Sequence, residues 1–229
     1  MGTISSDKRD AYYYRAKQLG YRARSAFKLI DIDGEFGIFE NARNAVDLCA
    51  APGSWSQVLE RSIHCSDRKI VAVDVQEMPP IGDIIILKDD ITSESCLERI
   101  KSIFNGESAC LVVCDGAPEV TGLHDLDEYL QTDLLKSSLK ICCEVGRPGS
   151  IFVGKCFRGE YTGFMVRHFL KFYETVDVVK PRSSRDASAE CFILARGLRV
   201  TDEDPLAMSV DGDAPLDFEM KECGELRIS

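Results

Sequence analysis

The chain has 229 residues and a formal net charge of −10, a size compatible with one sizeable α/β domain. No apolar run reaches the roughly 18 residues that a membrane-spanning helix needs, and the polar N-terminus with Lys8, Arg9 and Asp10 is unlike a signal peptide. Ten cysteines without a Cys-x-x-Cys motif and three scattered histidines argue against zinc. We therefore expect no membrane association, no bound metal and a cytoplasmic location, where thiols stay reduced.

The charge is distributed unevenly along the chain. Residues 1–30 carry seven basic and two acidic residues, whereas residues 200–229 carry nine acidic and two basic ones. The basic segment also holds four tyrosines interleaved with its arginines, at positions 12, 13, 14 and 21. This combination suits the phosphates and bases of a nucleic acid. The alternative interpretation is a solvated, charged helix.

Apolar runs and helical patterns alternate along most of the chain. Residues 8–33 are expected to be helical in two pieces, with a hinge near Gly20. Strands are then predicted at 44–48, 70–75, 83–87, 110–114, 150–155, 174–179 and 190–195. Helices are predicted at 54–64, 93–104, 125–145 and 161–172.

This alternation predicts an α/β, Rossmann-like fold with a mostly parallel seven-stranded sheet and helices on both faces. The last two strands are separated only by the loop 180–189, which predicts an antiparallel hairpin at one edge. We assign residues 1–199 to one domain, with a basic helical arm over about 1–33. Residues 200–229 are expected to form an acidic tail that is disordered or docked on a partner.

The most informative segment is 46–56, with the sequence VDLCAAPGSWS. A short apolar strand runs into a turn of small residues, and a helix follows from about Ser54. The amides of a helix N-terminus favour an anionic group. The segment lacks the endings of a P-loop and of a dinucleotide-binding loop, so a carboxylate-bearing nucleotide such as S-adenosylmethionine fits better. The alternative is an ordinary strand-to-helix turn.

Several acidic residues end or follow predicted strands, where ligands bind in such sheets. Asp74 ends IVAVD and could accept both hydroxyls of a ribose, while Asp90 follows the third strand and could accept from an adenine amine. Asp115 ends LVVCD. Each acid alone could instead cap a helix or a turn. Trp55 could pack on the aliphatic part of the ligand or simply in the core.

Three further charged residues are candidates for the chemistry. Lys155 ends the strand IFVGK, Glu190 opens the final strand, and Lys28 lies on the N-terminal helical segment. A lysine at the end of a parallel strand is expected to point into the ligand crevice. Taken singly, each residue fits better as a surface charge or a salt-bridge partner, and the sequence does not show that they meet Asp115.

Together these motifs resemble the FtsJ family of ribose 2′-O-methyltransferases over about residues 7–196. The resemblance implies a class I methyltransferase fold and a catalytic Lys-Asp-Lys-Glu tetrad at Lys28, Asp115, Lys155 and Glu190. It also implies that S-adenosylmethionine contacts five residues: Gly53, Trp55, Asp74, Asp90 and Asp115. An ordinary lysine is charged at neutral pH, so Lys155 as general base requires surroundings that disfavour the charged form. The two carboxylates would then orient the lysines.

The segments DKRDAYYY at 7–14, YRARSAFKL at 21–29 and CDGAPEVTGLHD at 114–125 resemble the eukaryotic tRNA enzymes of this family. That resemblance implies 2′-O-methylation of nucleotides 32 and 34 in the tRNA anticodon loop. It also implies a separate partner subunit of helical-repeat or propeller type. The alternatives are the same chemistry on ribosomal RNA or an mRNA cap, and an inactive scaffold that binds the cofactor.

Overall fold

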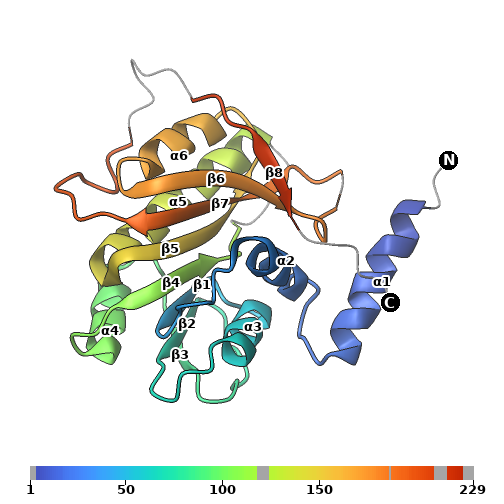
Figure 1. Ribbon diagram of the computed structural model, residues 1–229, viewed down its shortest axis with the longest axis horizontal. Helices are drawn as coiled ribbons and strands as arrows, with labels where there is room; N and C mark the ends of the chain where they lie inside the picture. Colours follow the sequence, from blue (N-terminus) through green and yellow to red (C-terminus); the bar gives the residue numbers. More distant parts are fainter. Residues whose placement is uncertain (1–3, 118–123, 186, 209–215, 224–229) are drawn as a thin grey trace.

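The computed structural model describes residues 4–117, 124–185, 187–208 and 216–223. Its centre is one mixed sheet of eight strands in the order β3-β2-β1-β4-β5-β7-β6-β8 (Figure 1). In chain order the strands are β1 Ala45–Leu48, β2 Ile70–Asp74, β3 Ile85–Lys88, β4 Ala109–Cys114, β5 Gly146–Phe157, β6 Tyr173–Pro181, β7 Glu190–Leu198 and β8 Met220–Cys223.

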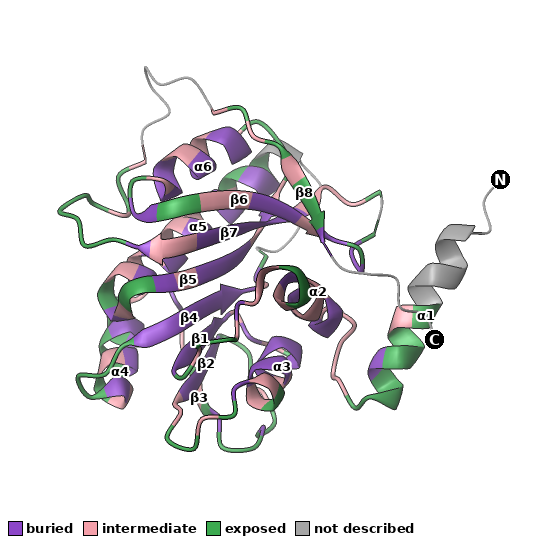
Figure 2. Cartoon of the chain, in the orientation of Figure 1, coloured by how far each residue is buried: buried purple, intermediate pink, exposed green. Residues whose placement is uncertain are grey.

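The first five strands are parallel, with β1 at the centre of the group between β2 and β4. Every residue of β1, β2 and β4 is buried, as Figure 2 shows for the middle of the sheet. Strands covered on both faces need apolar residues at successive positions, which explains the continuous apolar runs seen in the sequence. Strand β3, at the edge, is partly exposed.

The described residues include six helices: α1 Ile4–Gln18, α2 Ala26–Phe36, α3 Ser54–Ser62, α4 Glu94–Phe104, α5 His124–Val145 and α6 Thr162–Phe169. The buried apolar residues of α2 other than Phe27, and those of α3, belong to one apolar cluster. The buried apolar residues of α4, α5 and α6 belong to the other. The two sets of helices therefore cover opposite faces of the sheet (Figure 1). The predicted Rossmann-like fold class is confirmed.

The N-terminal helical segment breaks where Gly20 was expected to act as a hinge. Helix α1 ends at Gln18, α2 begins at Ala26, and Gly20 adopts a left-handed φ of 72°. Helix α1 stands beside α2 at one side of the molecule, where the Tyr12 ring lies 5.4 Å from that of Phe27 (Figure 1). The break is seven residues wide rather than a single hinge, and these residues, 19–25, form the connector between α1 and α2.

The predicted hairpin of β6 and β7 is present and antiparallel, with β7 inserted between β5 and β6. The outer edge of β6 is not open, because Met220–Cys223 pairs with it in parallel as β8. This eighth strand lies in the segment expected to be a tail. Its four residues are too few to show a strand period, and its pairing depends on the edge that β6 offers. Parts of two predicted segments lie outside the described residues. They are residues 209–215 and 224–229 of the predicted tail, and residues 118–123 of the segment 114–125 that resembles the tRNA enzymes.

Within the described residues, no helix combines the length and the apolar content needed to cross a membrane.

Candidate active site

The carboxyl edge of the parallel strands gathers three of the four predicted tetrad residues. Asp115 directly follows β4, and Lys155 lies near the end of the neighbouring strand β5. Strand β7 runs the other way, so its first residue, Glu190, pairs with Phe157 at the same edge. The topology therefore brings these side chains together although 75 residues of sequence position separate Asp115 from Glu190.

Lys28 reaches this edge from outside the sheet, on the first turn of α2. Its Nζ donates a 2.7 Å hydrogen bond to Oε2 of Glu190 and lies 3.5 Å from Oδ1 of Asp115. Lys155 Nζ lies 3.5 Å from the same Asp115 oxygen and 3.8 Å from the same Glu190 oxygen. The four groups form an alternating square of two ammoniums and two carboxylates, with side chains 12–17% exposed.

Backbone and side-chain contacts hold this square in place. Lys155 Nζ also donates to the backbone oxygen of Asp115 at 3.0 Å. Gln131, buried on α5, donates to the backbone oxygens of Lys155 at 2.6 Å and Gly116 at 3.1 Å. Ser184 donates to the second carboxylate oxygen of Glu190 at 3.0 Å. Each strand end that carries a tetrad residue is thus fixed by a neighbouring element.

The charge state of Glu190 follows from its neighbours. Burial alone would raise the pKa of Glu190, but the nearby ammonium of Lys28, its hydrogen bond and the charge of Lys155 together hold that pKa below its usual value. Glu190 is therefore ionised at neutral pH, and each carboxylate of the square faces two cations.

The connector 19–25 fixes Lys28 to the loop at 46–56. Trp55 Nε1 donates to the Ser25 backbone oxygen at 2.9 Å, and the hydroxyls of Ser25 and Ser54 are 2.7 Å apart. The indole of Trp55 is 2% exposed and packs 5.7 Å from the Phe192 ring. Of the two interpretations of the Trp55 ring, core packing is therefore the one observed. Only the backbone amide of Trp55, in the first turn of α3, remains suited to a ligand.

Arg22 crosses the same loop. Its guanidinium donates to the backbone oxygens of Pro52 and Pro80, both at 2.9 Å. Gly53 adopts a φ of 101° beneath it, and a Cβ atom there would lie 2.7 Å from Arg22 Nη1 and 2.6 Å from Ile81 Cδ1. A side chain at position 53 would meet both strain and steric overlap, so the turn requires glycine.

The two remaining predicted ligand acids occupy different settings. Asp74, at the end of β2, is 8% exposed and accepts from the backbone amides of Ala51 at 2.8 Å and Gln76 at 2.7 Å. It thereby orients the loop. Asp90 is exposed and accepts from the amide and hydroxyl of Thr92, the turn-capping arrangement that was the alternative for each acid. The structure brings together the four tetrad residues. It places Gly53 in the turn of the loop and Asp74 against the loop.

Asp47 has a structural role that the sequence interpretation missed. It is fully buried in β1 and accepts from the Ser56 hydroxyl at 2.5 Å, below the loop. Burial raises the pKa of Asp47 to about 8, although the Ser56 hydrogen bond opposes this. A carboxyl that is mostly neutral near pH 7 thus links β1 to α3. The available signal was an acidic residue inside the otherwise apolar strand 45–48.

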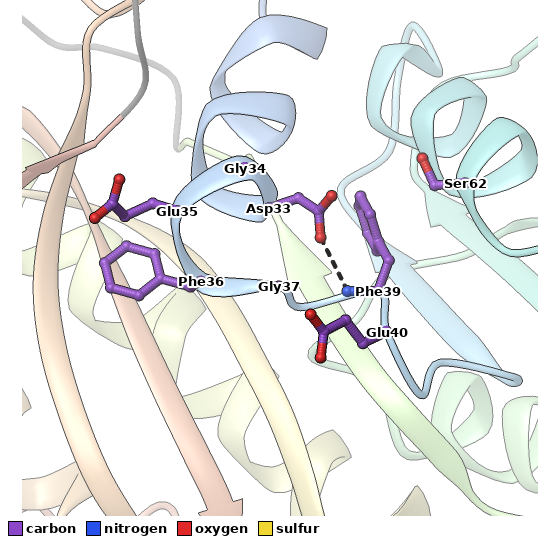
Figure 3. A pocket seen from close by; sticks show the side chains of 8 residues that line it. All are labelled: Asp33, Gly34, Glu35, Phe36, Gly37, Phe39, Glu40 and Ser62. Carbon is purple, nitrogen blue, oxygen red and sulfur yellow. Dashed lines mark hydrogen bonds between the residues drawn. The ribbon is translucent and has the colours of Figure 1, made fainter.

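A separate hollow of about 630 Å³ lies at the C-terminal end of α2 (Figure 3). Asp33, Glu35 and Glu40 contribute to its lining, and Asp33 accepts a 3.0 Å hydrogen bond from the Phe39 amide. Lys28 lies at the opposite end of the same helix. The acidic lining disfavours both a cofactor carboxylate and RNA phosphate, so we do not assign chemistry to this hollow. Among the described residues, no group of three His, Cys, Asp or Glu side chains could hold a metal ion.

A family model described as FtsJ-like methyltransferase matches residues 21–198, which include the loop and the whole tetrad. The chain belongs to this family. The resemblance stated from the motifs is thereby confirmed.

FtsJ-like relatives include tRNA (cytidine(32)/guanosine(34)-2′-O)-methyltransferases from two eukaryotes. The Homo sapiens protein is 50% identical over 198 residues, covering 86% of this chain and 60% of its own length. The Schizosaccharomyces pombe protein is 49% identical over 203 residues, covering 85% of this chain and 71% of its own length. A solved structure of a Plasmodium falciparum protein named as a ribosomal RNA methyltransferase has a TM-score of 0.68 at 22% identity. It covers 78% of this chain and 98% of that one, and shows the shared fold.

The substitution Lys28→Ala should raise the pKa of Glu190, because Lys28 supplies the strongest contributions that oppose burial. Carbon-13 NMR titration of the Glu190 carboxyl measures this directly. In the wild-type protein the lowered pKa stabilises the fold above the unfolded value of about 4.3, and that contribution is lost as the pH falls through the folded pKa. Lys28→Ala should lose this contribution.

Lys69→Ala is the matched control, because Lys69 lies at the amino ends of the parallel strands, far from Glu190, and pairs with Glu107 at 2.6 Å. It should leave the Glu190 titration unchanged. An identical Glu190 titration in Lys28→Ala and wild type would contradict the charge square as described.

Proposed function

We propose that this chain transfers a methyl group from S-adenosylmethionine to the ribose 2′-hydroxyl of nucleotides 32 and 34 in the tRNA anticodon loop. The observation that carries the proposal is the complete Lys-Asp-Lys-Glu square in an FtsJ-like methyltransferase. The names of relatives that are about half identical supply the RNA and the positions. The chain spans 60% and 71% of the length of those two relatives.

The residues at the loop fit the cofactor assigned to them. The first backbone amides of α3, at Ser54 and Trp55, have no partner four residues earlier in the helix and suit a carboxylate. Gly53 lets a ligand approach the backbone, and Asp74 and Asp90 offer acceptors for the ribose and the adenine amine. Asp115 Oδ1 is buried without a hydrogen bond. When bound, the cofactor supplies an electrophilic methyl group on a sulfonium.

The square assigns different tasks to the two lysines. Lys28 makes the shorter contact with Glu190, 2.7 Å against 3.8 Å for Lys155, and both are 3.5 Å from Asp115. Lys28 therefore takes the larger share of the Glu190 charge. Lys155 is the group we assign to accept the proton of the 2′-hydroxyl, a step that requires its Nζ to be a neutral amine when the substrate is bound. Asp115 and Glu190 position both lysine side chains, and the Lys28 ammonium can also hold a substrate phosphate as a point charge.

The alternatives receive less support. Ribosomal RNA and mRNA caps would use the same chemistry, but the relatives at about 50% identity carry tRNA names. An inactive scaffold has no need for four charged groups held within ion-pair distance at a buried edge. Burying charged groups is costly even when they are paired, so a scaffold would gain little from this arrangement. All ten cysteines are free, which supports a cytoplasmic location.

The substitution Lys155→Ala should reduce methyl transfer by about 10²–10⁴-fold, the usual contribution of a positioned general base. Single-turnover assays with labelled cofactor and tRNA measure the loss, and calorimetry with S-adenosylhomocysteine should show cofactor affinity close to wild type. Lys140→Ala is the control, since Lys140 is ion-paired to Glu94 at 2.6 Å between α5 and α4. A wild-type rate in Lys155→Ala would remove Lys155 from the mechanism.

The substitution Gly53→Ala should weaken S-adenosylhomocysteine binding by about tenfold or more, because the new Cβ overlaps Ile81 and Arg22 at a positive φ. Gly34→Ala in α2 is a matched control with no heavy atom within 4 Å of the added carbon. It should bind normally and be equally or more stable, as alanine favours helix. Equal cofactor affinity in Gly53→Ala and wild type would contradict the assigned loop.

We also propose that a separate protein subunit, of helical-repeat or propeller type by family resemblance, helps to hold the tRNA. The support is electrostatic: the chain has a net charge of −10, and the net-positive segment 1–30 carries only seven basic residues against two acidic ones. RNA binding by the chain alone should therefore be weak and should fall steeply with salt. Full-rate tRNA methylation by the purified chain at high salt would contradict the partner requirement.

A further inference from the structure

Two tyrosines from distant parts of the chain meet beyond the carboxyl end of β5. Tyr129 lies on α5, and Tyr161 directly precedes α6. Their ring centroids are 6.4 Å apart, and the ring planes meet at 73°. Tyr129 is 49% exposed, so part of its ring is open to a ligand. Neither residue belongs to the tetrad or to the cofactor loop.

The loop that carries Tyr161 is fixed to α5. The backbone amide of Tyr161 donates to Oε1 of Glu128 at 2.7 Å, and Glu128 is only 5% exposed. Thr162 accepts from the Gly159 amide and donates to the Phe157 backbone oxygen, both at 3.0 Å. The edge-to-face pair is therefore held by buried contacts, and its geometry is set before any ligand arrives.

The pair lies next to the catalytic edge. Gln131, two residues after Tyr129, donates to the backbone oxygen of Lys155 at 2.6 Å. Tyr161 follows Lys155 by six residues, through the end of β5. Arg158 lies between them, with an exposed side chain and a backbone amide that donates to the Ala189 oxygen at 2.7 Å. The aromatic pair and the exposed side chain of Arg158 therefore lie beyond the end of β5, the strand that carries Lys155.

We propose that Tyr129 and Tyr161 form a stacking site for an unpaired nucleobase of the RNA, adjacent to the nucleotide whose ribose is methylated. This inference rests on the proposed function, because it requires an RNA substrate. Bases splayed out of single-stranded loops are commonly bound by stacking on aromatic side chains. Arg158 is placed to neutralise a phosphate of the same segment. A base flanking the target ribose would be fixed while the 2′-hydroxyl faces Lys155.

The test measures RNA binding by the full chain with S-adenosylhomocysteine, which prevents turnover. The probe is an anticodon stem-loop RNA with fluorescent 2-aminopurine beside nucleotide 32 or 34. Tyr129→Ala and Tyr161→Ala should each weaken binding at least about fivefold, the lower end of what losing one stacked base causes. They should also lose the quenching that the wild type produces. Tyr129→Phe should retain both, because the ring and not the hydroxyl is used.

Leu126→Ala controls for general perturbation of α5, since Leu126 is 41% exposed on the same helix. It should bind like wild type. Unchanged affinity and quenching in both tyrosine-to-alanine variants would overturn the stacking site. So would an equal loss in Leu126→Ala.

A parallel methylation assay separates this inference from the proposed function. If wild type quenches the probe and Tyr129→Ala does not, yet no ribose methylation occurs, the stacking site stands and the proposed reaction fails. If wild type methylates the RNA and both alanine variants reach half-maximal rate at the wild-type RNA concentration, the reaction stands and the stacking site fails.

Discussion

The 2.7 Å contact between Lys28 and Glu190 joins helix α2, which lies outside the sheet, to β7, the strand that pairs antiparallel with β5. Without it, Asp115 and Glu190 would be two partly buried carboxylates sharing one lysine, and neither strand end would be electrostatically balanced. With it, the charges alternate around a square, and each carboxylate touches both cations. The arrangement of β4, β5 and β7 brings Asp115, Lys155 and Glu190 together at the carboxyl ends of the parallel strands. Lys28, the fourth residue, lies on α2.

Delivering Lys28 depends on the connector 19–25, which is bound along its length to α3. Gln57 donates to the Gly20 oxygen and accepts from the Arg22 amide, and Arg61 donates to the Leu19 oxygen. With the Trp55 and Ser25 contacts, these bonds make the connector and the cofactor loop one unit. The position of Lys28 and the shape of the proposed methyl-donor loop are therefore set by the same contacts.

The sequence predicted the elements whose signal is local. Strands β1, β2 and β4 could be predicted from their apolar runs because they are buried on both faces. The hairpin of β6 and β7 could be predicted because its loop is short. Strand β8 was missed because four residues carry no period and pair only where another strand offers an edge. The burial of the Trp55 indole, the neutral carboxyl of Asp47 and the pairing of Tyr129 with Tyr161 depend on contacts between distant segments. The tetrad was named by family resemblance, and only the fold explains why its members meet.

The central claim is that this protein methylates ribose in the tRNA anticodon loop and uses the four charged residues of the square to do so. Mapping 2′-O-methyl groups on tRNA from cells that lack this protein tests it most directly, because any partner is then present. We predict that the methyl groups at nucleotides 32 and 34 disappear and return with the wild-type chain but not with Lys155→Ala. Retention of both methyl groups without the protein, or their restoration by Lys155→Ala, would contradict the account.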